Sequence, residues 1–310
     1  MNNKKTVSSD KTSMPFGSSA AISDPTALSY LANFKPNLIT VLDDKNIVEE
    51  FCLKFKSWIF SSNLNTFKGI EDFKFSVYSN ATSESFDKFY MRNHTRRFRC
   101  FKGEYVYHQI AWRNSWPDWR FIEDDDLHPN DAVVLSYPFS DTGNKHHLQD
   151  DLLKKCSELG IPVLMDCVYL GVASGLEFDF SYPCITDVTV SLSKIFPVAH
   201  ARIGMRLTRI DDDDTLFVYQ KISYNNRLGA TLGKYFIDKF SVDYVVDKYK
   251  SKQEKFAEEL LVSPSNTVFF AVGGKEWQEY NRGGITNRLS FHRFLHLNSL
   301  KEYNDSKIKQ

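Results

Sequence analysis

Three short apolar runs in the middle of the chain decide the fold class: residues 131–136 (DAVVLS), 161–166 (IPVLMD) and 188–192 (VTVSL). Between the first two runs, apolar side chains recur with helical spacing at Leu148, Leu152, Cys156 and Leu159. A strand, a helix and a second strand within about 36 residues form a right-handed βαβ unit. The sequence therefore predicts an α/β fold with a mostly parallel sheet and helices on both faces.

The composition is that of an ordinary folded chain of 310 residues, with 42% hydrophobic residues, 39 Lys and Arg against 39 Asp and Glu, and 5 Cys. These values exclude a disordered chain, a collagen-like repeat and a disulfide framework. A formal net charge of zero gives no global attraction to nucleic acid or to an anionic membrane. Since the sequence shows neither an apolar run of roughly 18 residues nor a signal peptide, we expect a cytoplasmic protein without a membrane partner.

The pattern divides the chain into three regions. Residues 1–23 contain few large apolar side chains, which predicts a flexible N-terminal arm. Residues 24–225 are expected to form the large domain, with an amphipathic helix over residues 46–60. Residues 226–310 are expected to form a small C-terminal α+β domain, with a helix from about residue 228 to residue 250 and strand-like runs at 267–272 and 287–291.

A strand followed by a turn and a helix start is predicted near residue 80. Residues 73–78 (FKFSVY) have the alternation of a strand, and residues 79–84 (SNATSE) are small and polar. A helix N-terminus presents free backbone N–H groups, so this turn is a candidate phosphate site. An ordinary helix cap explains the same residues without a ligand.

Chemically able side chains follow the predicted buried strands, where open α/β sheets bind their ligands. Asp166 ends the second run, Tyr169 comes three residues later, and Lys194 follows the third run. Desolvation at this edge lowers the pKa of a lysine and makes it able to form a Schiff base. A surface lysine is the alternative for Lys194.

The order Asp166-x-x-Tyr169, Ser191-x-x-Lys194 and Arg202-x-Gly204 resembles the pyridoxal-phosphate (PLP) enzymes of the aspartate aminotransferase fold. The resemblance covers residues 70–295 and is strongest over 131–204. It implies PLP as the cofactor, held as a Schiff base on Lys194, with Asp166 on the ring nitrogen and Tyr169 on the ring hydroxyl. For the cofactor phosphate it implies four residues: Ala81, Thr82, Ser191 and Arg202.

Two further segments match the same family. Residues 223–230 (SYNNRLGA) resemble the stretch through which its subunits complete each other's sites, which implies a homodimer. Residues 287–291 (NRLSF) resemble the segment whose arginine holds the substrate α-carboxylate, which makes Arg288 the substrate-binding candidate. A guanidinium group suits that bidentate contact, although Arg288 could also be a surface residue of an edge strand.

The sequence departs from the family at two places. Family members usually carry Asn-Pro-Thr-Gly where this chain has SDTG at residues 140–143, so Ser140 stands in for the Asn that bonds the ring hydroxyl. The aromatic that stacks on the ring is assigned to Trp112, with Tyr107 and His108 as the next choices. A core position explains Trp112 equally well.

We therefore predict a PLP-dependent aminotransferase that acts on a small-molecule amino donor and a keto acceptor, and that binds no metal. A decarboxylase, a lyase or a racemase would use the same cofactor, and a protein that keeps the fold without turnover is another reading. The basic run over residues 92–102, with interleaved aromatics, would be the contact surface of a nucleic-acid-binding protein. Net neutrality argues against that last alternative.

Overall fold

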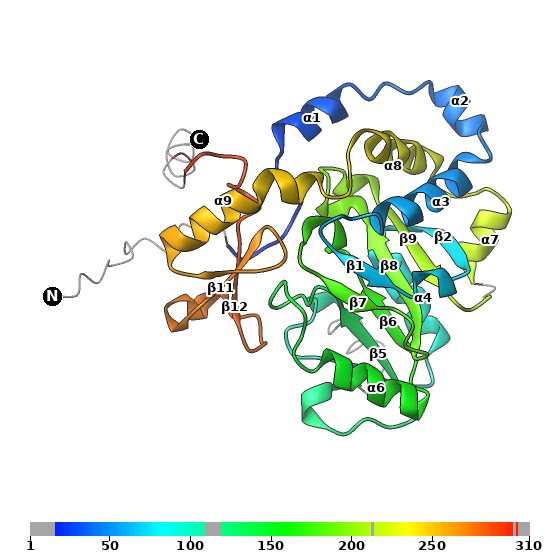
Figure 1. Cartoon of the computed structure of the whole chain (residues 1–310). Helices are drawn as coiled ribbons and strands as arrows, with labels where there is room; N and C mark the ends of the chain where they lie inside the picture. Colours follow the sequence, from blue (N-terminus) through cyan, green and yellow to red (C-terminus); the bar gives the residue numbers. More distant parts are fainter. Residues whose placement is uncertain (1–15, 109–118, 212–213, 300–301, 303–310) are drawn as a thin grey trace.

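The computed structural model describes residues 16–108, 119–211, 214–299 and 302. Figure 1 shows a large α/β part and, beside it, a smaller part that contains α9 (Tyr244–Leu260), β11 (Phe270–Gly273) and β12 (Asn287–Ser290). Trp112, the predicted ring-stacking aromatic, lies outside the described residues. Over the described ranges, the helices are too short or too polar to cross a membrane.

The main sheet has seven strands in the described part of the chain, in the order β2-β9-β8-β6-β5-β3-β4. β9 pairs antiparallel with both of its neighbours, and all other neighbours pair parallel. The three apolar runs lie side by side as β5, β6 and β8, which confirms the predicted fold class. The strands are β2 (Phe75–Asn80), β3 (Arg97–Cys100), β4 (Trp119–Phe121), β5 (Asp131–Ser136), β6 (Val163–Asp166), β8 (Ile185–Ser191) and β9 (Ile203–Thr208).

Helices cover both faces of this sheet, because alternate residues of each strand point to opposite sides. On one face, Val133 and Leu135 join a core cluster with apolar residues of α3, α6 and α8. On the other face, Ala132 and Val134 pack with α4. These helices are α3 (Ile47–Ile59), α4 (Ala81–Arg92), α6 (Gln149–Leu159) and α8 (Arg227–Lys239), of which α3 and α6 confirm two predicted helices.

The single helix predicted over residues 228–250 is wrong, because the chain forms two helices, α8 and α9, in this region. The backbone of Phe240 leaves the helical conformation (φ −110°, ψ 138°), and its ring packs against Phe196 and Phe236. α8 packs against α3 so closely that a Cβ on Gly233 would lie 2.5 Å from a ring carbon of Phe51. The predicted boundary at residue 226 assigned α8 to the small domain, whereas it lies on the main sheet.

The remaining elements are short. β11 begins at Phe270, three residues later than the predicted run, and forms an antiparallel sheet with β10 (Ser263–Pro264) and β12. A parallel pair is formed by β1 (Thr66–Lys68) and β7 (Glu177–Asp179). The other helices are α1 (Pro25–Ala32), α2 (Leu38–Asp43) and α7 (Thr215–Lys221), with 3-10 helices η2 (Ile70–Asp72), η3 (Ile122–Asp124), η4 (Leu170–Val172), η5 (Leu192–Lys194), η6 (Ala199–Ala201) and η7 (Lys275–Tyr280).

The N-terminal segment, residues 16–24, is anchored to the protein at the buried residues Phe16, Ile22 and Asp24, which corrects the expectation of a flexible arm up to residue 23. Phe16 is fully buried, and its ring contacts four aromatic rings of the small part, those of Trp277, Tyr280, Phe291 and Phe294. Asp24 caps α1 at Ala27 N and pairs with Lys248 of α9 at 2.6 Å. The local composition is polar, but one large aromatic side chain fixes the segment.

Phe16→Ala should destabilise the protein by about 3–5 kcal/mol, because it empties a fully buried aromatic site. Urea unfolding followed by circular dichroism measures this loss. Met91→Ala, which truncates a side chain that is 60% exposed on α4, should change the unfolding free energy by no more than about 0.5 kcal/mol. Equal stabilities of the two variants would contradict the packing of the N-terminal segment.

Candidate functional site

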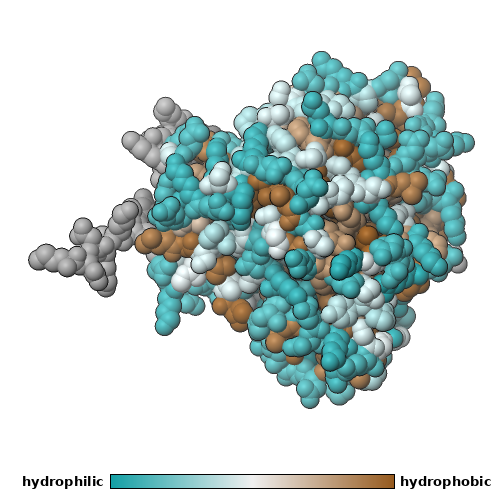
Figure 2. All heavy atoms as spheres, in the orientation of Figure 1, coloured by the Kyte–Doolittle hydropathy of each residue, from teal (hydrophilic) through white to brown (hydrophobic). Residues whose placement is uncertain are grey.

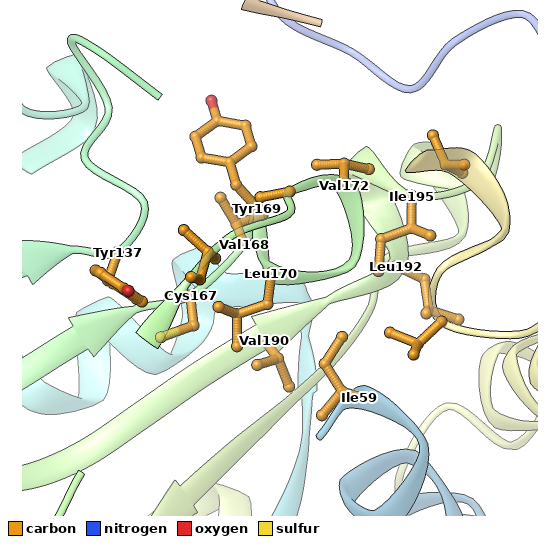
Figure 3. Packing of buried hydrophobic residues seen from close by; sticks show 14 of the residues in the cluster. Ile59, Tyr137, Cys167, Val168, Tyr169, Leu170, Val172, Val190, Leu192 and Ile195 are labelled. Carbon is orange, nitrogen blue, oxygen red and sulfur yellow. The ribbon is translucent and has the colours of Figure 1, made fainter. Parts of the chain in front are cut away.

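The polar ends of the three central strands meet at one edge of the sheet. β5 and β6 pair so that Ser136 lies opposite Asp166, and Asp166 in turn lies opposite Thr189 of β8. Figure 3 shows the apolar residues beneath this edge, where side chains of the segment after β6 and of the segment after β8 share one core. Because this packing is continuous, the polar residues above it have fixed positions.

Asp166 is a buried carboxyl group, with 2% of its surface exposed. The backbone N–H of Val168 donates to Oδ1 at 3.3 Å. The pKa of Asp166 is raised from the ordinary value of 3.8 to about 8. Burial is the largest cause and the nearby carboxyl of Glu104 adds to it, while the Val168 hydrogen bond and the charge of Lys194 lower the pKa. A cationic partner would therefore stabilise the charged form.

Lys194 closes η5, directly after β8, and its side chain comes within electrostatic reach of Asp166. Its Nζ donates to the carbonyl oxygen of Ser19 at 2.7 Å, and the Ser19 Oγ and Tyr169 Oη atoms are 3.0 Å apart. The N-terminal segment therefore contacts two of the predicted site residues. The ring of Tyr169 stands away from the apolar side chains below it (Figure 3).

An anion cradle lies where α4 begins beside β9. Arg202 Nη2 donates to the Ser83 hydroxyl at 3.0 Å and to the Asn80 carbonyl at 3.3 Å. Ala81 has a left-handed φ of 61°, and a Cβ on Gly204 would lie 2.6 Å from its Cα. The free N–H groups of a helix start, a hydroxyl and a guanidinium group suit a phosphate. Two of the predicted phosphate residues, Ala81 at the start of α4 and Arg202 directly before β9, thus lie at the same place.

Ser191 and Thr82 lie next to this cradle. Thr82 is buried in the first turn of α4. The hydroxyl of Ser191 donates to the carbonyl of Ile203 at 2.9 Å and accepts from the backbone N–H of Ser193 at 3.1 Å. The side chain of Ser193 lies 2.7 Å from that of Ser191, so it is a further hydroxyl at this position that the sequence analysis did not single out.

Ser140 takes part in the site through its backbone. Its N–H donates to the Ser136 hydroxyl at 2.9 Å, and its carbonyl accepts from Arg288 Nη1 at 2.6 Å. Arg288 is 2% exposed, lies over the ring of Phe270 at 4.0 Å and also hydrogen-bonds Tyr169. Burial lowers its pKa from the ordinary arginine value to about 10. The predicted carboxylate-binding arginine is therefore a buried residue beside the other site residues rather than a surface residue.

Two residues that follow β3, Glu104 and Tyr105, lie at the site but are not among those predicted from the sequence. Tyr105 is within electrostatic reach of Asp166, Tyr169 and Arg202. The two aromatics named as alternatives to Trp112 point elsewhere: the Tyr107 hydroxyl donates to Asp87 of α4 at 2.6 Å, and His108 is paired with the Tyr90 hydroxyl. Tyr105 is thus the described aromatic of this segment that faces the site. The turn at Gly103, directly after a parallel strand, was the available signal.

Glu104 is a second buried carboxyl beside Asp166. Its Oε1 accepts from the Ser136 backbone N–H at 2.7 Å and its Oε2 from the Ser136 hydroxyl at 2.6 Å. The pKa of Glu104 is raised to about 7, because the effect of burial exceeds that of these hydrogen bonds, which lower the pKa. The same Ser136 hydroxyl holds the backbone of Ser140. Glu104 therefore fixes the turn to which Arg288 is bound.

Two arginines of the basic run, and Asp214 near the start of α7, have structural partners. Arg97 Nε and Arg99 Nη1 pair with the buried Asp131 at 2.6 and 2.8 Å. Asp214 caps the first turn of α7 and pairs with Arg206 at 2.5 Å. Buried ion pairs of this kind are poor contacts for a nucleic acid, since their charges are already neutralised inside the protein.

Solved structures share this fold over nearly the whole chain. The histidinol-phosphate aminotransferase of Clostridium acetobutylicum superposes with a TM-score of 0.62 at 15% identity, covering 95% of this chain and 99% of its own. A PLP-bound C–S lyase of Staphylococcus hominis gives 0.62 at 12%, with 100% and 96% covered, and an aminotransferase of Staphylococcus aureus gives 0.64 at 11%, with 100% and 98% covered. Neither a family model nor a curated protein matches the sequence. The chain has the fold of the PLP-dependent aminotransferases.

The residues at the strand ends fit PLP. Asp166 is buried and receives a backbone hydrogen bond, so a protonated ring nitrogen would supply the cation that its charged form lacks. Gly204 keeps β9 within contact of Ala81, which leaves the cradle of Ser83 and Arg202 for the phosphate group. Lys194 lies next to Ser19, whose hydroxyl in turn contacts the Tyr169 hydroxyl.

Gly204→Ala should weaken PLP binding by at least about tenfold, because the added Cβ must push the start of α4 away from the cradle. Fluorescence or absorbance titration with PLP measures the loss. Gly17→Ala is the matched control, since a Cβ at Gly17 meets no atom within 4 Å. Unchanged affinity in Gly204→Ala would argue against phosphate binding at this cradle.

Asp166→Asn should make the cofactor-free protein more stable at pH 8 and leave it nearly unchanged at pH 4. The folded state keeps a proton on Asp166 up to about pH 8, while the unfolded chain releases it near pH 4, so the wild-type unfolding free energy falls over this range. Asn carries no proton to release. Urea midpoints at both pH values test this, with the exposed Asp126→Asn as control; equal shifts in the two variants would contradict it.

Proposed function

We propose that the protein is a PLP-dependent aminotransferase that moves an amino group between an amino acid and a keto acid, with Lys194 as the covalent attachment point of the cofactor. One observation carries the proposal. Lys194, Asp166 and Arg288 belong to three separate segments, yet they lie at one edge of the sheet, beside a cradle suited to phosphate. The fold shared with aminotransferases supports it.

When bound, PLP supplies an electron sink that stabilises a carbanion at the substrate carbon. Asp166 would hold a proton at the ring nitrogen, since the buried carboxylate gains most from a cation placed next to it. The N–H groups at the start of α4, together with Ser83 and Arg202, would fix the phosphate end. Trp112, outside the described residues, stays the proposed ring-stacking aromatic, and Tyr105 is the alternative among the described residues.

Lys194 would carry the proton between substrate and cofactor once its amine is released. Its Nζ donates to the Ser19 carbonyl, which keeps the amine at one place, and the Ser19 hydroxyl joins Tyr169 to the same group. A base must lie within hydrogen-bond reach of the proton it removes. The N-terminal segment would thus orient the amine and shield it from water.

Arg288 would bind the α-carboxylate of the substrate through its guanidinium fork. Its Nε is buried without a hydrogen-bond partner among the described residues, so an oxygen of the substrate can complete its contacts. The Ser140 carbonyl and the ring of Phe270 hold the side chain in position. The proposal also includes that the protein is a homodimer and that it is located in the cytoplasm.

The likeness to a C–S lyase makes bond cleavage at the substrate side chain the second candidate, because that chemistry starts from the same cofactor-bound substrate. The two outcomes differ in their products. An aminotransferase converts the bound cofactor to its amine form and releases a keto acid, while a lyase returns the cofactor unchanged and releases a thiol.

Lys194→Ala should abolish turnover and the visible absorbance band of lysine-bound PLP while the circular dichroism spectrum stays that of the wild type. In the wild type, borohydride reduction followed by peptide mapping should place the label on Lys194. Lys239→Ala, an exposed lysine at the end of α8, should behave as the wild type. A label spread over surface lysines, or turnover without Lys194, would refute the assignment and favour a protein that binds without catalysis.

A further inference from the structure

Two arginines of the small part converge on one backbone carbonyl. Arg288 Nη1 donates to the Ser140 carbonyl at 2.6 Å, and Arg282 Nη1 approaches the same oxygen at 3.4 Å. Arg282 belongs to the loop between η7 and β12, where the Asn281 side chain donates to the carbonyls of Gly284 and Thr286 at 3.2 Å. The loop is thus fastened on itself, and the two guanidinium groups lie within a few ångströms of each other.

Neither guanidinium group has an ion-pair partner among residues 16–108, 119–211 and 214–299. The hydrogen bonds of Arg282 and Arg288 go to neutral groups, the Ser140 carbonyl for both and the Tyr169 side chain for Arg288. A carbonyl satisfies an N–H donor but leaves the positive charge uncompensated. Two adjacent cations with neutral partners need anionic ligands.

The nearest carboxyl groups are poor counterions for this pair. Asp141 Oδ2 accepts from the Thr286 backbone N–H at 3.1 Å and from its hydroxyl at 2.8 Å. Burial raises the pKa of Asp141 and the charges of Arg282 and Arg288 lower it, while burial raises the pKa of Glu104 to about 7. In the described part of the chain neither carboxyl forms an ion pair with Arg282 or Arg288. Lys194 and Arg293, together with Arg288, place positive charge near His292.

We infer that the substrate carries two anionic groups, with Arg288 on the α-carboxylate and Arg282 on a second carboxylate or a phosphate ester at the end of a short side chain. The inference rests on the proposed function for the role of Arg288. One guanidinium fork pairs with one carboxylate or phosphate, so two arginines match two anionic groups. A monoanionic substrate leaves one of the two charges uncompensated.

Calorimetric titration of the PLP-loaded protein at low salt tests this with matched pairs: glutarate against pentanoate, and phosphoglycolate against glycolate. In the wild type, at least one dianionic ligand should bind about tenfold or more tightly than its monoanionic partner. Arg282→Gln should lose that preference while keeping the affinity for the monoanion, since Arg288 is untouched. Arg120→Gln, an exposed arginine on the edge strand β4, should keep the preference.

Equal binding of dianion and monoanion by the wild type would overturn the inference. So would an Arg282→Gln variant that loses both ligands equally, because Arg282 would then only support the Ser140 turn. The larger preference of the two pairs tells whether the second group is a carboxylate or a phosphate. The absorbance spectrum of each sample tests the proposed function separately, because the band of lysine-bound PLP is absent if Lys194 does not hold the cofactor. The present inference is tested by the preference for the dianionic ligand over the monoanionic one.

Discussion

The parallel pairing of β5, β6 and β8 is the constraint on which the rest of the structure depends. Parallel strands place their carboxyl ends at the same edge, so the residues after them must lie together whatever the intervening chain does. Here that register sets Ser136 opposite Asp166, and the segment after β8 brings Lys194 to the same place. A shift of one residue would turn each of these side chains to the other face.

Electrostatics at this edge follows from burial. Asp166 and Glu104 are both enclosed, and their pKa values rise because water no longer stabilises their charged forms. Arg288 shows the opposite shift for the same reason. Burial at this edge therefore disfavours the charged forms of both the acidic and the basic groups. Most of the visible outer surface, by contrast, is hydrophilic (Figure 2).

Much of the fold follows from local patterns, and so do the site residues that follow strands. The strands with apolar runs, the helices α3 and α6 and the motif order around Lys194 depend on neighbours within a few residues, which periodicity and spacing record. Tyr105 and Arg282 could not be found in this way. Each lies in an irregular segment, and its place depends on contacts with chain more than 30 residues away. The burial of Phe16 could not be predicted for the same reason, because its aromatic neighbours come from the other end of the chain.

By itself, the sequence determined the α/β class, the βαβ order and the identity of the residues at three strand ends, since hydrophobic periodicity and strand-to-loop spacing are properties of short segments. Only the tertiary structure decided that Ser19 contacts Lys194 and that the backbone carbonyl of Ser140 receives both Arg288 and Arg282. These contacts join segments separated by more than a hundred residues. Their formation depends on how the small part and the N-terminal segment pack on the main sheet, which no local pattern encodes.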